Sequence, residues 1–423
     1  MEAIKENLVP GLKVGKSGIE YSNEKALIGK YGIKRYEVNS SGKRISQLEH
    51  IKESQGISIK TTVDLEVQKF AQELLNGQAG SICAMDIYTG EVIAMASSPT
   101  YDPNKFTHGI GHKDWGEIRD NPLKPLVNKS VAGLYSPGST LKPLVALAAL
   151  EFGTIDPEKS IQCKGHKHPY ELYGVKYHCW KKNGHGYMKL RNAIKQSCDI
   201  YFYEMARILG VDKLSIIAKR YGLGSNILKD VYFDEKKGVV PNTEWKKNAL
   251  GKSWYLGETV INGIGQGYTQ TTPIQLCLMT AQIANGGYKI KPKILTDDNQ
   301  LTSEQVKKAI QDSKINYFYT PLYDDQKNIK IIQEAMFSST NELYGTSYKS
   351  RIDDPKYQFA GKTGTAQVKR ISKRERELDL KTFEIPYEER DHALYVAFGP
   401  YKNPRYSLSI IAVSYTHLRA HET

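Results

Sequence analysis

The sequence lacks two features that would reveal where the protein works. No apolar run reaches the roughly 18 residues that a membrane-spanning helix needs, and residues 1–10 contain no apolar core of a signal peptide. By itself, this absence indicates a soluble, cytoplasmic protein. That inference holds only for a complete chain, and both ends of the sequence suggest a piece of a longer one.

Acidic residues are outnumbered by basic ones: 46 Asp and Glu face 59 Lys and Arg, which gives a formal net charge of +13. A basic chain admits nucleic acid, an anionic membrane surface or a polyanionic cell wall as a neighbour. The densest basic cluster lacks the interleaved aromatic residues that stack on bases, so we expect no nucleic-acid binding and interpret the cluster as a solvated or substrate-facing loop. Its members are Lys369, Arg370, Lys373, Arg374 and Arg376.

Length and pattern divide the chain into three unequal parts. With 423 residues, of which 40% are hydrophobic, it can hold two or three domains, or one large α/β domain with a smaller appendage. Residues 1–60 are short polar pieces with little periodicity, which suggests an extended domain whose other strands are missing. Residues 61–414 carry clear helix and strand patterns. Residues 415–423 lose this alternation, so we interpret them as a non-native tail.

The patterned region predicts helices mixed with antiparallel hairpins. Segments with capping residues predict helices, and apolar segments joined by tight turns predict strands. In chain order we expect an amphipathic helix over 64–75, a hairpin over 81–96, a buried helix starting near 139, helices over 189–195 and 200–209, a buried helix from 272 to about 286, a charged helical insertion over 295–350, a strand of small residues over 358–368 and a hairpin over 395–413.

One of these helix starts carries a reactive pair of side chains. Proline is tolerated only in the first turn of a helix, so Pro143 places the helix start close to Ser139. Residues three apart share a helix face, so the Lys142 amine should lie beside the Ser139 hydroxyl, in the positive potential of the helix amino end. A lysine whose pKa is lowered by burial and by neighbouring cations can accept the serine proton and make Ser139 a nucleophile.

The Ser-x-x-Lys spacing alone is weak, because the chain contains it twice more in polar, turn-rich surface sequence, at residues 22–25 and 40–43. Two further polar islands supply context: Ser197-Cys198-Asp199 between two helical patterns, and Lys362-Thr363-Gly364 on the strand of small residues. Serine acyl transferases combine a Ser-x-x-Lys helix start, a Ser-x-Asn loop and a Lys-Thr-Gly strand. Three islands in this order are far more specific than any one of them.

On these residues the sequence resembles the transpeptidase domain of the class B penicillin-binding proteins, and within them the elongation-specific type, penicillin-binding protein 2. The resemblance extends over residues 12–414. It rests on the three islands and on further short segments at residues 15–20, 90–95, 180–181, 184–186, 263–267 and 390–393.

The resemblance implies DD-transpeptidation. Ser139 would attack the D-Ala-D-Ala bond of a peptidoglycan stem peptide, and an amine of a second stem peptide would resolve the acyl-enzyme. β-Lactams would acylate the same serine. The same acylation parts would serve a DD-carboxypeptidase, in which water resolves the acyl-enzyme, and a non-catalytic β-lactam-binding scaffold or sensor would keep the fold. Intact Ser139, Lys142 and Lys362 favour the enzyme.

The resemblance also implies a role for each polar island. Lys142 would be the general base, and Ser197 would relay protons to the leaving group. The backbone N–H groups of Ser139 and Thr365 would form the oxyanion hole. Asp199 stands where the general pattern has Asn, which puts hydrogen-bond donation to the substrate amide in doubt. The substrate carboxylate would be held on one strand, by Lys362, Thr363, Gly364 and Thr365.

Cysteine is scarce, with five in the chain. Cys83 and Cys277 lie in apolar segments and should be small core residues. The other three lie near a histidine, where either a disulfide between Cys163 and Cys179 or a structural zinc is possible. The resemblance favours zinc, because some elongation-type members carry one in this region. The expected ligands are Cys163, Cys179, His185 and Cys198.

The resemblance further implies an α/β (α+β) fold, with a central five-stranded antiparallel sheet flanked by helices and a helical subdomain, the active site lying between them. Residues 1–60 would be a remnant of the pedestal domain and 61–414 the transpeptidase domain. The family's last helix would be missing after 414, so we expect poor stability. The protein would face the periplasm from the inner membrane, through an anchor preceding Met1. Its partners would be a SEDS-type glycan polymerase and the rod-shape scaffold.

Overall fold

The computed structural model describes residues 13–107, 109–296, 301–312, 320–368 and 384–414. The basic cluster around residue 370 and the predicted tail over 415–423 lie outside these ranges. The first helices and strands are α2 (Gly18–Ser22), α3 (Glu24–Leu27), β1 (Ile33–Val38), β2 (Arg44–Ile51), α4 (Leu65–Leu75), β3 (Gly80–Asp86), β4 (Val92–Ser98), η1 (Pro103–Phe106), α5 (His112–Arg119) and α6 (Lys129–Ala132).

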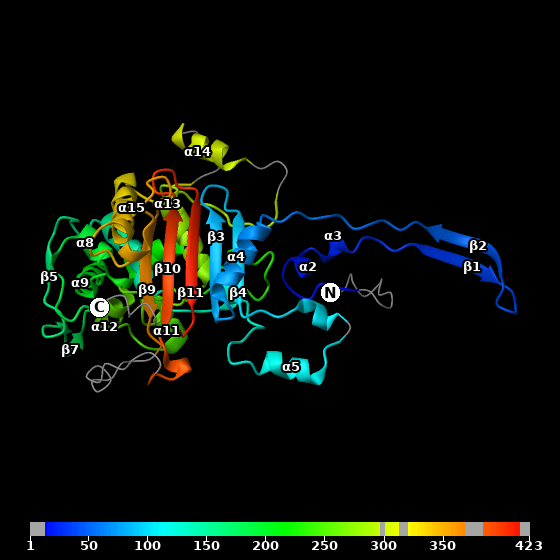
Figure 1. Cartoon of the computed structure of the whole chain (residues 1–423), viewed down its shortest axis with the longest axis horizontal. Helices are drawn as coiled ribbons and strands as arrows, with labels where there is room; N and C mark the ends of the chain where they lie inside the picture. The colour runs from blue at the N-terminus through cyan, green and yellow to red at the C-terminus, as the bar shows by residue number, and fades with distance from the viewer. Residues whose placement is uncertain (1–12, 108, 297–300, 313–319, 369–383, 415–423) are drawn as a thin grey trace.

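A five-stranded antiparallel sheet forms the centre of the molecule, with the order β4-β3-β11-β10-β9 (Figure 1). Tyr395 pairs with Ile410 on one side and with Thr363 on the other, which fixes the register of the last three strands. Both predicted hairpins and the predicted strand of small residues are therefore confirmed. These strands are β9 (Ala360–Ala366), β10 (His392–Gly399) and β11 (Tyr406–Ala412).

Helices cover both faces of the sheet, as expected. On one face α4 packs through Ala71 and Leu75 against β3 and β4. This helix begins where Asp64 accepts hydrogen bonds from two backbone N–H groups, and it ends at Asn76 in the left-handed conformation. On the other face lies α13 (Pro273–Ala284), all of whose residues are buried. The predicted Thr272 cap and capping box are present at its start.

A helical region adjoins the β9 edge of the sheet (Figure 1). Its elements are η2 (Gly138–Leu141), α7 (Lys142–Glu151), β5 (Ile161–Cys163), β6 (Tyr170–Leu172), β7 (Val175–Tyr177), β8 (Gly186–Met188), α8 (Leu190–Lys195), α9 (Asp199–Leu209), α10 (Val211–Arg220), α11 (Thr243–Leu250) and α12 (Leu256–Asn262). The expected division into a sheet domain and a helical subdomain is therefore confirmed.

The charged segment over 295–350 is not an insertion along its whole length, and this prediction was wrong. It contains α14 (Ser303–Gln311), α15 (Gln326–Asn341) and η3 (Tyr348–Ser350). Of these, α15 packs on β9 and α8 and buries apolar side chains such as Ile332 and Met336. The charged residues on the exposed side of α15 had obscured the apolar pattern of its buried side. A last short turn, η5 (Tyr387–Glu389), precedes β10.

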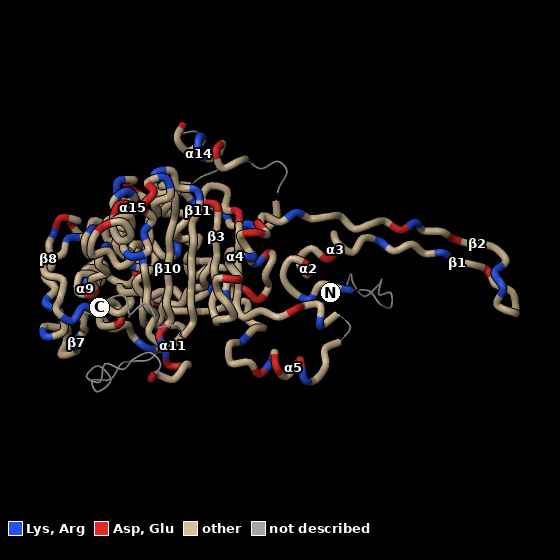
Figure 2. Tube along the Cα trace, viewed as in Figure 1, with Lys and Arg blue, Asp and Glu red and all other residues tan. Residues whose placement is uncertain are grey.

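The hairpin of β1 and β2 extends away from the main body (Figure 1). Its two strands pair only with each other among the described residues. Several of its apolar side chains are exposed, and Leu48 keeps 66% of its accessible surface. Basic and acidic residues alternate along the hairpin and over the main body (Figure 2). None of the described helices combines the length and the apolar character needed to cross a membrane.

Candidate active site

Ser139 lies in the short turn η2, directly before α7. The sequence predicts a helix start at Ser139, and the structure refines this: the chain makes one 3-10 turn first, and the α-helix begins at Lys142 with Pro143 in its first turn. Ser139 is half-buried, whereas its neighbours Thr140 and Leu141 are buried. The turn therefore presents this serine at the edge of the core.

The turn η2 and strand β9 touch through their backbones. Gly138 has φ +54°, and a Cβ atom there would overlap the carbonyl group of Thr365. A Cβ atom on Gly364 would lie 2.7 Å from Cγ2 of Thr140. Glycine at both positions thus lets the Ser139 turn lie directly against the strand that carries Lys362.

Lys142 is fully buried and makes three hydrogen bonds to the loop before α9. Its Nζ donates to the Ser197 carbonyl (2.9 Å), to Ser197 Oγ (3.1 Å) and to Asp199 Oδ1 (2.7 Å). An ammonium has three donors, so all are used. The sequence pointed to burial and neighbouring cations around this lysine; the structure confirms the burial and adds a direct contact with a carboxylate. No hydrogen bond joins Lys142 to the Ser139 hydroxyl within the described part of the chain.

Asp199 faces the interior rather than an open cleft. Its side chain is buried, and its second oxygen, Oδ2, accepts the backbone N–H of Trp180 at 3.0 Å. Burial raises the pKa of the Asp199 carboxyl, and the Lys142 ammonium acts in the opposite direction. With both oxygens engaged, this carboxylate positions Lys142 rather than donating to a substrate amide.

Ser197 adopts a backbone conformation that is unusual for serine, with φ +55°. Its carbonyl accepts two hydrogen bonds, one from Lys142 and one from the indole Nε1 of Trp180 at 3.0 Å. Trp180 was not predicted as a site residue. The available signal was its position directly after Cys179, because a residue next to a candidate metal ligand must lie near the cluster.

The β9 side chains divide between two faces. Lys362 and Gly364 share the face toward η2, since residues two apart in a strand point the same way. Lys362 is buried, and its Nζ donates to the Thr363 carbonyl at 3.0 Å. Thr363 donates through its hydroxyl to Oγ1 of Thr346 at 2.8 Å. The structure thus brings all three polar islands of the sequence around Ser139, and it adds Thr346, for which the sequence carried no signal.

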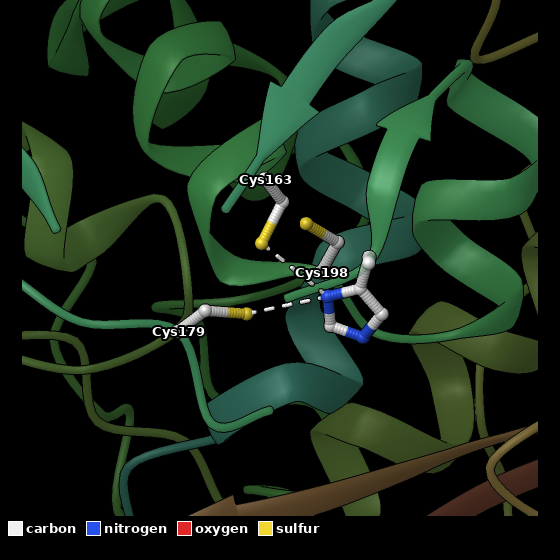
Figure 3. A group of neighbouring side chains, drawn as sticks. Cys163, Cys179 and Cys198 are labelled. Carbon is white, nitrogen blue, oxygen red and sulfur yellow. Dashed lines mark hydrogen bonds between the residues drawn. The ribbon is translucent and has the colours of Figure 1, made fainter. Parts of the chain in front are cut away.

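The four predicted metal ligands form one buried cluster (Figure 3). They come from the end of β5, the loop after β7, the residue before β8 and the residue before α9, and their ligand atoms all lie within 4.8 Å of one another. All five cysteines are free thiols, so the alternative of a disulfide between Cys163 and Cys179 was wrong. Cys83 and Cys277 lie in the core, as predicted.

The distances within the cluster suit a tetrahedral ion. Nδ1 of His185 lies 3.6 Å from Sγ of Cys163 and 3.5 Å from Sγ of Cys179. Ligands on a tetrahedral zinc, with its usual bond lengths, are about 3.6 to 3.8 Å apart. Hydrogen bonds from the neighbouring thiols lower the pKa of Cys163, and the same contacts raise the pKa of Cys198, so one thiolate is shared among protonated neighbours when no cation is bound. The residues therefore fit a metal ion.

Comparisons with known proteins identify the matching families and relatives. Residues 80–417 match the family described as penicillin binding protein transpeptidase domain, and residues 2–61 match the penicillin-binding protein dimerisation domain. Proteins named peptidoglycan D,D-transpeptidase MrdA are 35% identical to this chain in Acinetobacter baumannii, over 413 residues, and 35% in Escherichia coli K12, over 401 residues. The alignments cover 97% and 94% of this chain but 59% and 61% of those proteins, so the chain spans less than two thirds of their length.

Solved structures agree with these matches. A complex between penicillin-binding protein 2 and MreC from Helicobacter pylori is similar with a TM-score of 0.80 at 31% identity, covering 95% of this chain and 68% of that one. Penicillin-binding protein 2 of Pseudomonas aeruginosa, crystallised in complex with WCK 5153, is similar with a TM-score of 0.77 at 35% identity. That alignment covers 97% of this chain and 82% of the other.

Proposed function

Because the chain belongs to the penicillin-binding protein transpeptidase family, we propose that it is a serine D,D-transpeptidase of the elongation-specific type, which cross-links peptidoglycan stem peptides and is inhibited by β-lactams. One observation carries the proposal. The buried Lys142 holds the Ser197–Asp199 loop by three hydrogen bonds, one turn away from Ser139. This arrangement supports the proposal, because a nucleophile at Ser139, a base at Lys142 and a proton relay at Ser197 would lie close together.

In the first step the hydroxyl of Ser139 attacks the carbonyl carbon of the penultimate D-Ala. The amine of Lys142, after it has given up its extra proton, takes the hydroxyl proton as the C–O bond forms, and the C–N bond breaks when the resulting tetrahedral intermediate collapses. Ser197, hydrogen-bonded to Lys142, passes a proton to the departing D-Ala nitrogen. The oxyanion that develops between these events would be held by the N–H groups of Ser139 and Thr365.

The substrate would bind along the free edge of β9. Among the described residues this strand ends the sheet, so an added peptide strand could pair along its outer side. Lys362, Thr363 and Thr365 would hold the terminal carboxylate, with Gly364 leaving room for the turn that carries the nucleophile. In the second step an amine of another stem peptide attacks the ester, the bond to Ser139 breaks, and the serine regains its proton.

Covalent labelling with a fluorescent penicillin tests this function. We expect the chain to be labelled and Ser139→Ala to abolish the label, because the acyl bond forms on that oxygen. Ser22→Ala is the matched control, since Ser22 and Lys25 have the same Ser-x-x-Lys spacing in an exposed segment, and its label should be unchanged. A folded wild-type chain without label would instead indicate a non-catalytic scaffold. Release of D-Ala without cross-linked product from paired stem peptides would indicate a carboxypeptidase.

We further propose that the cluster of Cys163, Cys179, His185 and Cys198 holds a structural zinc ion. Three thiolates and one imidazole make a closed tetrahedral site, in which the metal contributes to folding rather than to the reaction. The support is the geometry: the observed nitrogen–sulfur distances fit the ion, and Cys198 directly precedes Asp199. The ion would therefore fasten the loop that holds Lys142 to the segment around residues 163–185.

We also propose the setting that the resemblance implies, at the periplasmic face of the inner membrane, with a SEDS-type glycan polymerase and a rod-shape scaffold as partners. The Helicobacter pylori relative was solved as a complex with MreC, which supports a scaffold partner. Residues 1–60 would be the pedestal part and 61–414 the transpeptidase domain. Co-purification of the scaffold with the chain, lost when residues 1–60 are removed, would support the scaffold as a partner and residues 1–60 as the pedestal part. Co-purification that persists without residues 1–60 would contradict the assignment of these residues to the pedestal.

A further inference from the structure

One loop, residues 263–267, contacts both sides of the oxyanion hole that the proposed function requires. We propose that Gln266 is a positioning residue for this hole: the loop fixes the spacing between the Ser139 turn and β9, and thereby the spacing between the two donor N–H groups. The inference rests on the proposed acyl transfer and deepens it. Gln266 itself would touch neither the substrate nor the reacting atoms.

On one side the loop holds the turn that carries the nucleophile. The N–H of Gly138 donates to the carbonyl of Gly265 at 2.8 Å. Gly265 has φ +73°, and a Cβ atom there would overlap the backbone of Gly138. The residue before Ser139 therefore lies in direct backbone contact with the loop, which limits how far the Ser139 N–H can move.

On the other side the loop holds the edge strand. Nε2 of Gln266 donates to the carbonyl of Thr365 at 2.9 Å. In an antiparallel strand the N–H and C=O of one residue point to the same side, so a Thr365 carbonyl bonded from outside the sheet indicates that the Thr365 N–H also faces the free edge. This is the orientation that an oxyanion donor at this residue needs. Gln266 thus secures the peptide direction of Thr365 from the side where no neighbouring strand does so.

The loop is itself held in place by α12 and α9. The N–H of Gln266 donates to the Ile261 carbonyl at 3.2 Å, and the N–H of Gly265 donates to the Asn262 carbonyl at 2.9 Å, so the loop continues directly from α12. Gly263 packs so closely on Ala206 of α9 that a Cβ atom would overlap it. Gly138 in turn touches Thr365. The turn is in backbone contact with both the strand and the loop, and the Gln266 side chain completes the triangle by joining the loop to the strand.

Removing the Gln266 amide should affect the transition state more than substrate binding. Donors in an oxyanion hole gain most of their strength when charge develops on the carbonyl oxygen. A small displacement of the Thr365 N–H would therefore slow acylation while it leaves the first, non-covalent complex nearly unchanged. A role limited to stability would instead lower the melting temperature and leave the rate of the folded enzyme intact.

The test uses Gln266→Met, which keeps the length of the side chain and removes its donor. Stopped-flow acylation by a fluorescent penicillin separates the dissociation constant of the first complex from the acylation rate constant. We expect the rate constant to fall about tenfold or more, with less than about a twofold change in the dissociation constant. A boronic acid that forms a tetrahedral adduct with serine should lose affinity by a similar factor, because its oxygen occupies the same hole.

Gln68→Met is the matched control. Gln68 caps the opposite edge of the same sheet, where its Nε2 donates to the Met95 carbonyl of β4 at 3.2 Å. This variant should change the melting temperature without changing the acylation rate constant. If Gln266→Met does not fold, Gln266→Glu serves instead, because a carboxylate of the same length cannot donate to Thr365.

The results separate this inference from the proposed function. A wild-type chain that is never acylated would overturn the proposed function and this inference with it. A wild-type chain that is acylated, together with a folded Gln266 variant of unchanged rate constant, would overturn the inference alone. A variant that binds the penicillin more tightly and reacts faster would also overturn it, because Gln266 would then be blocking the β9 edge.

Discussion

At the scale of single residues, the site depends on a buried ion pair. Lys142 is fully buried, and the Asp199 carboxylate lies 2.7 Å away. Taking two charges out of water is unfavourable unless each is paired and hydrogen-bonded, and here both conditions are met. The pair therefore contributes conformational specificity rather than much stability, because it fixes one geometry for Lys142 and for the loop that bears Ser197.

Ser197 is held in a backbone conformation that serine does not favour by itself. A serine at φ +55° costs of order 1 kcal/mol or more relative to an ordinary conformation. Hydrogen bonds from Lys142 and Trp180 to its carbonyl hold it there. In this conformation the Ser197 hydroxyl accepts a hydrogen bond from Lys142, as the proposed proton relay would require.

A second charged cluster, remote from the reaction, should show a clear pH dependence. Glu342 accepts hydrogen bonds from Arg191 and from Lys195, which links the end of α15 to α8. These bonds, chiefly that of Arg191, lower the pKa of Glu342 to about 2, from an ordinary 4.5. A carboxyl with a lowered folded-state pKa stabilises the fold above its ordinary pKa, and this contribution disappears as pH falls toward 2.

We therefore predict that Glu342→Gln melts at a lower temperature than the wild type above about pH 5. The gap should narrow steadily between pH 4.5 and 2, as measured by melting curves in matched buffers. Glu158→Gln is the control, because its partner Lys189 and Glu158 itself are exposed, and exposed pairs contribute little. A gap that widened toward acid pH would contradict the assignment.

At the scale of elements, the contact between η2 and β9 decides whether a site exists. Strand β9 is built from small residues because the nucleophile turn on one side and Tyr395 on the other leave no room for larger ones. A Cβ atom on Gly361, for instance, would overlap the Tyr395 hydroxyl. The unusual composition of this strand is thus a packing requirement.

Substitution at Gly138 tests this contact. Gly138→Ala places a Cβ atom against the Thr365 carbonyl, so we predict loss of penicillin labelling in addition to a cost of about 1 kcal/mol from the positive φ. Gly153→Ala is a matched control, since Gly153 has φ +57° but nothing within 4 Å of the added atom. It should have a similar conformational cost and retain labelling. Equal labelling of the two variants would show that the turn and strand can separate without consequence.

At the scale of the whole molecule, the segment over residues 163–198 joins the Cys/His cluster to the residues that contact Lys142. Cys179 precedes Trp180, and Cys198 lies between Ser197 and Asp199, so two thiols of the cluster are next to residues that contact Lys142 or its hydrogen-bond partners. A metal ion at this cluster would therefore couple global stability to the geometry of the site.

We predict that Cys179→Ser, or removal of metal by a chelator under reducing conditions, lowers the melting temperature and the acylation rate together. Metal content measured on the purified protein should fall from about one zinc per chain to well below it. Cys277→Ser is the control: this buried cysteine is far from the cluster in the sequence and contacts Ser407, so metal content and labelling should persist. Full activity of reduced, metal-free protein would contradict the coupling.

The sequence by itself determined the elements whose signals are local. The cap at Asp64, the capping box at Thr272 and the alternation of the hairpins specify their helices and strands without reference to the rest of the chain. The motifs around Ser139, Ser197 and Lys362 could be recognised in the same way, whereas the four possible metal ligands were favoured by the resemblance to the family. Their chemistry depends on residue type and short spacing, which a linear reading preserves.

Tertiary structure decided what depends on distant segments meeting. The partner of Lys142 is a carboxylate 57 positions away, so no local pattern could identify Asp199 as its contact. The face of α15 is buried because β9, α8 and α7 pack against it. Trp180, Thr346 and Gln266 act through bonds to backbone or hydroxyl groups far along the chain. Residue type indicates a candidate nucleophile or metal ligand, whereas the residues that position these groups depend on contacts that only the folded chain creates.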